Sequence, residues 1–192
     1  MAEPEKIQFE DDICQLIKQM IRKQRTVSPA LLQVLPLLEK TFIKNKHCFG
    51  SVLLDCLNYY LIYGKDTIGM QPDLLKMFFR MADQALFTET QKRVVNNSEG
   101  ALLIQIILQI FAGNAALNEI LGQVLDRVTE RLSNNGEPLT NKLLKKHLLN
   151  VFVASLYYNP VATMNYLKIK GILKDVLLEI FKLKADFRES YE

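Results

Sequence analysis

The residue types that most often carry catalysis are scarce in this 192-residue chain. Its only two histidines, His47 and His147, lie in no HExxH sequence and in no cluster with cysteine. Their sequence context therefore predicts neither a metal site nor an activated nucleophile. The glycine-rich patterns that cradle phosphates, and the elbow that presents a catalytic serine, are also missing from the sequence. We therefore expect a protein that is not an enzyme, with no catalytic residues, no cofactor and no metal.

The cysteines point to buried thiols. Cys14, Cys48 and Cys56 are an odd number and form no CxxC pair. This pattern favours a reducing compartment over a secreted, disulfide-bonded protein. The apolar run from Ala101 to Ala112 is too short to span a bilayer, so we expect no membrane segment.

Acidic residues supply the best candidates for a binding site. Glu119, Asp126 and Glu130 share the polar face of a helix expected at 114–132, and Asp83 is expected on the same side of the molecule. Carboxylates grouped in this way suit a basic protein partner through steering and charge-assisted hydrogen bonds. Arg127 lies among them and weakens the acidic field, so an ordinary solvated face remains the alternative interpretation.

The elements that would position these residues are all helical. Hydrophobic residues make up 49% of the chain, and only 8 glycines and 6 prolines interrupt it, which are too few for a protein of many short strands. Apolar residues recur at helical spacing along most of the sequence. This periodicity predicts helices at 10–24, 29–44, 50–63, 72–87, 98–112, 114–132, 140–158, 160–168 and 172–183, with a kink near 32–36 from Pro36.

Helix starts recur at a nearly constant interval. Pro29, Pro72, Asn114 and Pro160 each follow a break, at spacings of 43, 42 and 46 residues. Helix pairs repeating every 40–47 residues or so are typical of HEAT and armadillo repeats. We therefore expect an α-solenoid of about four hairpins. Its expected parts are a flexible acidic lead-in (1–9), a repeat segment (10–185) with hairpins at 10–45, 50–87, 98–132 and 140–168 and an extra helix at 172–184, and a tail (186–192).

The order of several packing segments resembles one family. ASLYYNP (154–160) follows LDRVTERL (125–132) and LIQIILQ (103–109), and VSP (27–29) precedes LPL (35–37). In this order the segments resemble the importin-β superfamily, in particular its importin seven and importin eight branch, from about Asp11 onward. None of these strings is a catalytic signature.

The resemblance implies a segment from the C-terminal half of a nuclear transport receptor. Such a receptor shuttles between cytoplasm and nucleus and binds Ran-GTP and nucleoporins, with the Ran contacts mainly in N-terminal repeats. The second helix of each repeat would line the concave face and hold protein cargo, for example ribosomal proteins or histones. The expected cargo-binding residues are Asp83, Glu119, Asp126 and Glu130, and we expect no direct contact with nucleic acid or membrane.

Two other functions remain open at this stage. The first is a helical-repeat scaffold of a cytoplasmic complex without a transport role. The second is a nucleic-acid enzyme of the glycosylase type, which would need a basic concave face; the main basic cluster, which includes Lys18 and Arg22, lies instead on a first helix expected to be convex. We also expect exposed apolar residues at both ends of the stack, through which the chain could self-associate.

Overall fold

The computed structural model describes residues 4–44, 51–87, 94–133 and 139–189. Every regular element in these four ranges is an α-helix, so the predicted all-helical class is confirmed. Ten helices follow one another in the described ranges: α1 (Pro4–Gln24), α2 (Pro29–Lys44), α3 (Ser51–Tyr63), α4 (Lys65–Gly69), α5 (Pro72–Leu86), α6 (Val94–Ile110), α7 (Ala115–Ser133), α8 (Lys142–Tyr158), α9 (Pro160–Ile169) and α10 (Leu173–Glu189).

The predicted breaks are true helix starts because local chemistry fixes them. The Ser28 hydroxyl accepts a hydrogen bond from the Leu31 amide at 3.4 Å, ahead of α2. Asn159 caps α9 in the same way, its side-chain oxygen lying 3.0 Å from the Ala162 amide. In each case the side chain satisfies an amide that the helix leaves without an internal partner.

Several boundaries differ from the sequence-based prediction. Helix α1 begins at Pro4, so 4–9 extend the helix and do not form a separate lead-in; proline suits the first helical turn and acidic residues favour it. Asn141, not Thr140, caps α8, with its oxygen 3.1 Å from the Leu144 amide. The connection before Pro72 contains the short helix α4, and α10 continues to Glu189, into the predicted tail.

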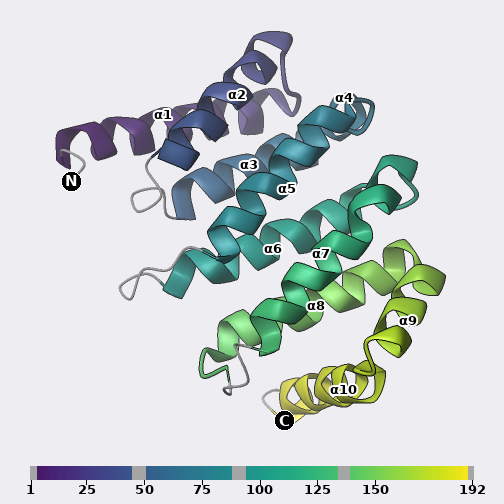
Figure 1. Cartoon of the computed structure of the whole chain (residues 1–192). Helices are drawn as coiled ribbons and strands as arrows, with labels where there is room; N and C mark the ends of the chain where they lie inside the picture. The colour runs from purple at the N-terminus through teal and green to yellow at the C-terminus, as the bar shows by residue number, and fades with distance from the viewer. Residues whose placement is uncertain (1–3, 45–50, 88–93, 134–138, 190–192) are drawn as a thin grey trace.

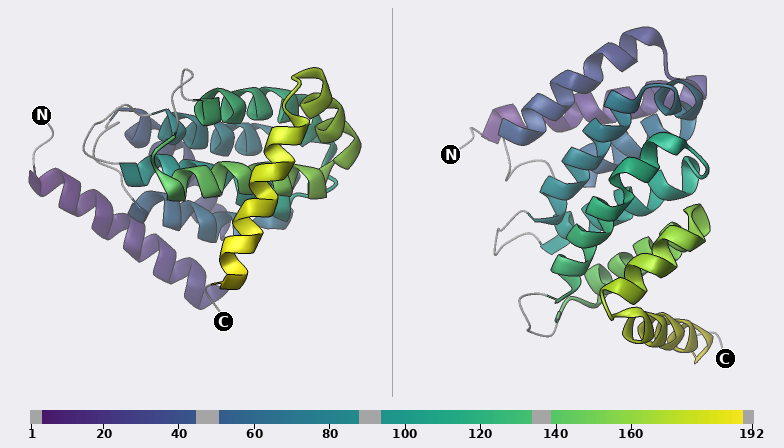
Figure 2. Two further views of the ribbon diagram at one scale, coloured as in Figure 1. Left: turned by 90° about the horizontal axis from the view of Figure 1, so that it is seen from below. Right: turned by 45° about the vertical axis from the view of Figure 1, so that its right-hand side comes forward.

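The helices form two layers (Figure 1). In one layer α1 contacts α3, α3 contacts α6, and α6 contacts α8. In the other layer α2 contacts α5, and α5 contacts α7. The two ends of the chain lie at opposite ends of this stack, and α10 lies across the C-terminal end, against α8 and α9 (Figure 2).

A continuous apolar core lies between the layers. Tyr60, Phe78 and Phe152 are its largest fully buried side chains. The Tyr60 hydroxyl donates a hydrogen bond of 2.9 Å to the carbonyl of Leu31 in α2, which ties α3 to α2. Pro36 lies inside the continuous helix α2, one turn and a half beyond that carbonyl.

Helices α5 and α6 approach each other closely at Gly100 of α6. A Cβ atom at this position would lie 2.7 Å from the Ala82 carbonyl oxygen and 2.8 Å from the Leu86 amide nitrogen, both in α5. Glycine therefore allows α6 to pack directly on the backbone of α5. In the part of the chain that the structure describes, no helix has the length and apolar character needed to cross a bilayer.

Candidate functional site

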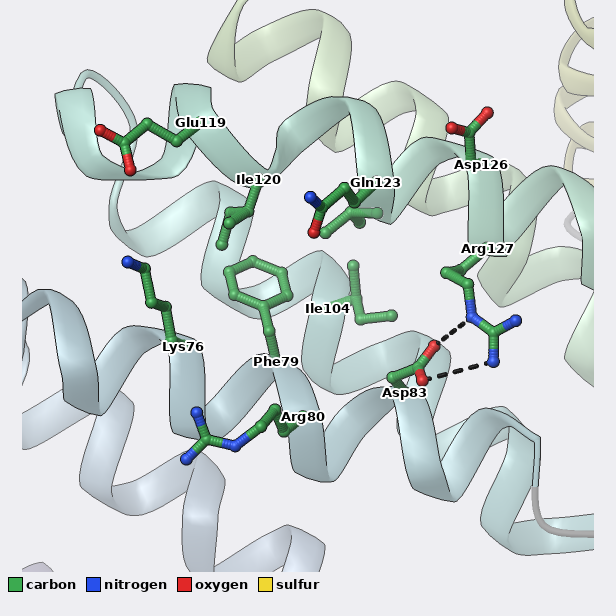
Figure 3. A pocket seen from close by; sticks show the side chains of 11 residues that line it. Lys76, Phe79, Arg80, Asp83, Ile104, Glu119, Ile120, Gln123, Asp126 and Arg127 are labelled. Atoms are coloured by element: carbon green, nitrogen blue, oxygen red, sulfur yellow. Dashed lines mark hydrogen bonds and ion pairs between the residues drawn. The ribbon is translucent and has the colours of Figure 1, made fainter.

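A groove of about 810 Å³ lies between α5 and α7, the two neighbouring helices of the second layer (Figure 3). Its size falls in the range of roughly 300–1,000 Å³ typical of ligand sites. The side chains around it come from α5, α6 and α7 and combine apolar with charged groups: Lys76, Phe79, Arg80, Asp83, Ile104, Glu119, Ile120, Gln123, Val124, Asp126 and Arg127.

The floor of the groove is apolar. Phe79 of α5 and Val124 of α7 are buried except for 8% of their surface, and Ile104 of α6 is more deeply buried still. Ile120 of α7 is half-buried and lies beside Phe79 on the groove side (Figure 3). Helical periodicity explains this face, since Ile120 and Val124 are four residues apart.

An ion pair joins the two helices at one end of the groove. The Arg127 Nε of α7 lies 2.8 Å from Asp83 Oδ1 of α5, and its Nη1 lies 2.7 Å from Glu130 Oε2. The guanidinium also covers the Phe87 ring, at 3.7 Å from the ring centroid. The hydrogen bond to Asp83 is the main cause of the raised pKa of Arg127. Two of the four predicted acidic residues are therefore held by one arginine.

Asp126 is also engaged inside the molecule. The Tyr166 hydroxyl of α9 donates a hydrogen bond of 2.9 Å to its Oδ1, and the Lys170 Nζ lies 2.7 Å from the same oxygen. The bond to Lys170, followed by that to Tyr166, lowers the pKa of Asp126. Burial raises the pKa of Tyr166 to about 12.

Glu119 is the one predicted carboxylate without an ion pair among the described residues. It is exposed near the start of α7. Lys76, exposed near the start of α5, likewise makes no ion pair within the described ranges. The two side chains lie on opposite rims at the same end of the groove (Figure 3).

The structure thus places three of the four predicted residues, Asp83, Glu119 and Asp126, around one groove. Glu130 lies outside its lining and is reached through Arg127. The sequence analysis did not predict that Arg127 pairs with Asp83 or that Lys170 pairs with Asp126, because each pair joins two different helices. A signal was available: the pairs Glu39–Arg80, Asp83–Arg127 and Asp126–Lys170 are separated by 41, 44 and 44 residues, close to the spacing of the helix starts.

The other residues considered in the sequence form no recognisable site within the described ranges. Cys14 and Cys56 are buried, and Cys48 and His47 lie outside the described residues. Burial lowers the pKa of His147. Within the described ranges, no three His, Cys, Asp or Glu side chains are close enough to hold a metal ion.

The basic cluster on α1 is partly neutralised. Lys18 forms an ion pair with Asp55 of α3, and its ammonium group lies 5.5 Å from the centroid of the Tyr59 ring. Lys18 therefore connects α1 with α3 inside the first layer.

Comparisons of the chain with protein-family models, with curated proteins and with solved structures give no match.

Proposed function

We propose that this chain is a protein-binding segment of a nuclear transport receptor of the importin-β superfamily, of the importin seven and importin eight branch. In this proposal the helix pairs are HEAT repeats, about four in number, and the molecule is not an enzyme. Support comes from the helix starts at intervals of 43, 42 and 46 residues and from the two layers of successive contacts. Stacked helix pairs of this kind offer long surfaces to partners.

The observation that carries the proposal is the groove between α5 and α7, where the second helices of two consecutive pairs meet. Asp83, Glu119 and Asp126 surround it, as a concave cargo site would require. A basic cargo, such as a ribosomal protein or a histone, meets Glu119 directly. It competes with Arg127 and Lys170 for the remaining carboxylates.

We propose the remaining parts of the transport role from the resemblance to the family. Ran-GTP and nucleoporins are partners of the full-length receptor, which shuttles between cytoplasm and nucleus. Exposed apolar side chains at the first pair of helices, Leu16 and Leu37, and at α10, Phe181, are the proposed points of self-association.

One observation favours a second function, a scaffold of a cytoplasmic complex without a transport role. Most carboxylates near the groove are paired inside the molecule: Asp83 and Glu130 share Arg127, and Asp126 pairs with Lys170. A surface with balanced charges gives little long-range attraction to a basic cargo. A scaffold has no need of such attraction.

Binding of purified core histones tests the cargo role. Their affinity for the chain is measured by fluorescence anisotropy over a range of salt concentrations, for the wild type and for the variant E119K/D126K/E130K. We expect the variant to bind more weakly and with a shallower dependence on salt, because three anionic contacts are removed.

The matched control is D66K/D73K/D175K, which changes the net charge equally at exposed positions outside the α5–α7 groove. Equal losses in both triple variants would show attraction by net charge alone. An unchanged affinity in the first variant would refute the cargo site, and the scaffold function would then be preferred.

A further inference from the structure

The free charges of the groove mark one end of it. Lys76 on the α5 rim and Glu119 on the α7 rim are both exposed, lie on opposite sides of the opening and form no ion pair with any residue that the structure describes (Figure 3). Each is the fifth residue of its helix, so α5 and α7 begin at the same end of the groove. A ligand entering at this end therefore meets a cation on one rim and an anion on the other.

At the opposite end the ion pair between Asp83 and Arg127 bridges α5 and α7 (Figure 3). The Arg127 guanidinium also contacts Glu130 and covers the Phe87 ring. The apolar floor lies between this ion pair and the end that carries Lys76 and Glu119. The groove thus has an apolar floor, an ion pair at one end and two side chains of opposite charge at the other.

The charge pattern selects one class of partner. A polyanion such as a nucleic acid would meet Glu119, and a polybasic tail would meet Lys76 and the paired Arg80. A protein segment that carries both signs of charge satisfies both rims at once. The apolar floor formed by Phe79 and Ile120 adds a place for a hydrophobic side chain, the usual anchor of a peptide in a groove.

We propose that the groove between α5 and α7 docks a short segment of a partner protein in which an aliphatic or aromatic anchor lies between a basic and an acidic residue. The anchor packs on Phe79 and Ile120. The basic residue pairs with Glu119 and the acidic residue pairs with Lys76. This proposal rests on the protein-binding role proposed above, and it specifies an amphipathic segment where a basic cargo was the first expectation.

Selection from a random peptide library tests it. Phage that display random 12-residue peptides are selected on the immobilised full chain. We expect enrichment of peptides with one large apolar residue flanked by opposite charges in a constant order. Enrichment of purely basic peptides, or no enrichment, would overturn the proposal.

Charge exchange then tests the geometry. In the variant K76E/E119K the two rims trade their charges, so the selected peptide should bind about three- to thirtyfold more weakly, as expected for the loss of two exposed ion pairs. A synthetic peptide with its two charged residues exchanged should recover the lost affinity. The matched control K65E/D66K makes the same exchange at two adjacent exposed residues of α4 and should leave binding unchanged.

The apolar floor is tested separately by Ile120→Asn, a change at a half-buried side chain. With the fold verified by circular dichroism, the variant should bind the selected peptide at least about tenfold more weakly, since an apolar anchor would meet an amide. Unchanged binding in this variant, or in K76E/E119K, would overturn the proposal.

The outcomes separate the two proposals. If histones fail to bind while the selected peptides respond to the charge exchange, the basic-cargo role fails and the groove assignment stands. If histones bind through Glu119 while the affinity of the selected peptides is unchanged in K76E/E119K, the groove assignment fails and the cargo role stands.

Discussion

Gly100→Ala should destabilise the protein although alanine is the better helix former. The added Cβ would lie 2.7 Å from the Ala82 carbonyl oxygen, 2.8 Å from the Leu86 amide nitrogen and 3.0 Å from the Ala85 Cβ. An ordinary contact between carbon and oxygen is about 3.3–3.6 Å, so α5 and α6 would have to separate by roughly 0.7 Å. Two of the three atoms belong to the α5 backbone and cannot rotate away.

The magnitude follows from two opposing terms. Alanine gains about 1 kcal/mol over glycine in a helix interior. Separating the helices by this amount loses about a quarter to a half of the attractive energy of each van der Waals contact along the interface. Overpacking of a dense core typically costs about 1–3 kcal/mol. Because α5 and α6 share a long interface and backbone atoms are involved, we place the cost near the upper end. The expected net loss is about 2 kcal/mol.

Urea unfolding followed by circular dichroism at 222 nm measures this loss. With an m-value of about 2 kcal/mol per molar, the midpoint for Gly100→Ala should fall by about 1 M. The control is Gly122→Ala in α7, where a Cβ would meet no atom within 4 Å. This variant should gain about 1 kcal/mol and raise the midpoint by about 0.5 M. If Gly100→Ala were as stable as the wild type, the packing argument would be refuted.

Three further predictions concern charge and hydrogen bonds. Burial, and secondarily the charge of Asp55, raise the pKa of Glu99 to about 7. Between about pH 5 and pH 8 the folded state therefore binds a proton that the unfolded state has released, so the free energy of unfolding should fall as the pH rises. Glu99→Gln should flatten this slope in urea titrations at a series of pH values. A double-mutant cycle of Asp83→Asn and Arg127→Gln should give a coupling energy of about 0.5–1 kcal/mol. This energy should decrease in 1 M salt, because both side chains are partly exposed. A coupling energy that does not change with salt would contradict the assigned ion pair. Tyr158→Phe removes a hydroxyl that donates a hydrogen bond of 2.6 Å to the carbonyl of Asn114, the residue before α7. This change should cost about 1 kcal/mol in thermal unfolding, whereas the exposed Tyr157→Phe should cost nothing measurable.

Helix existence could be predicted from the sequence because its causes are local. Proline at the first helical turn and an oxygen-bearing cap at Ser28 or Asn159 act over three or four residues. Ends governed by subtler preferences were harder to predict. Asn141 outcompetes the neighbouring Thr140 as a cap, and α4 forms within a connection that contains glycine. Both outcomes depend on small free-energy differences between adjacent backbone conformations.

The acidic candidates illustrate the same division. Periodicity grouped Glu119, Asp126 and Glu130 on one helix face, and that grouping required only the helical repeat. Whether these carboxylates are available to a partner could not be predicted from the sequence, because it depends on where residues of other helices lie. Arg127 reaches across to Asp83, and Lys170 reaches back to Asp126, over separations of 44 residues in each case.

The amino-acid sequence alone predicts the helical class, most of the helix starts and the apolar faces of the long helices, since these depend on interactions between residues a few positions apart. Tertiary structure decided which helices became neighbours, and therefore which charges were neutralised and which remained free. It brought Lys76 and Glu119 to opposite rims of one groove and placed α6 against the α5 backbone at Gly100. Such contacts depend on the packing of distant segments around a shared core, so the pattern of any single helix does not contain them.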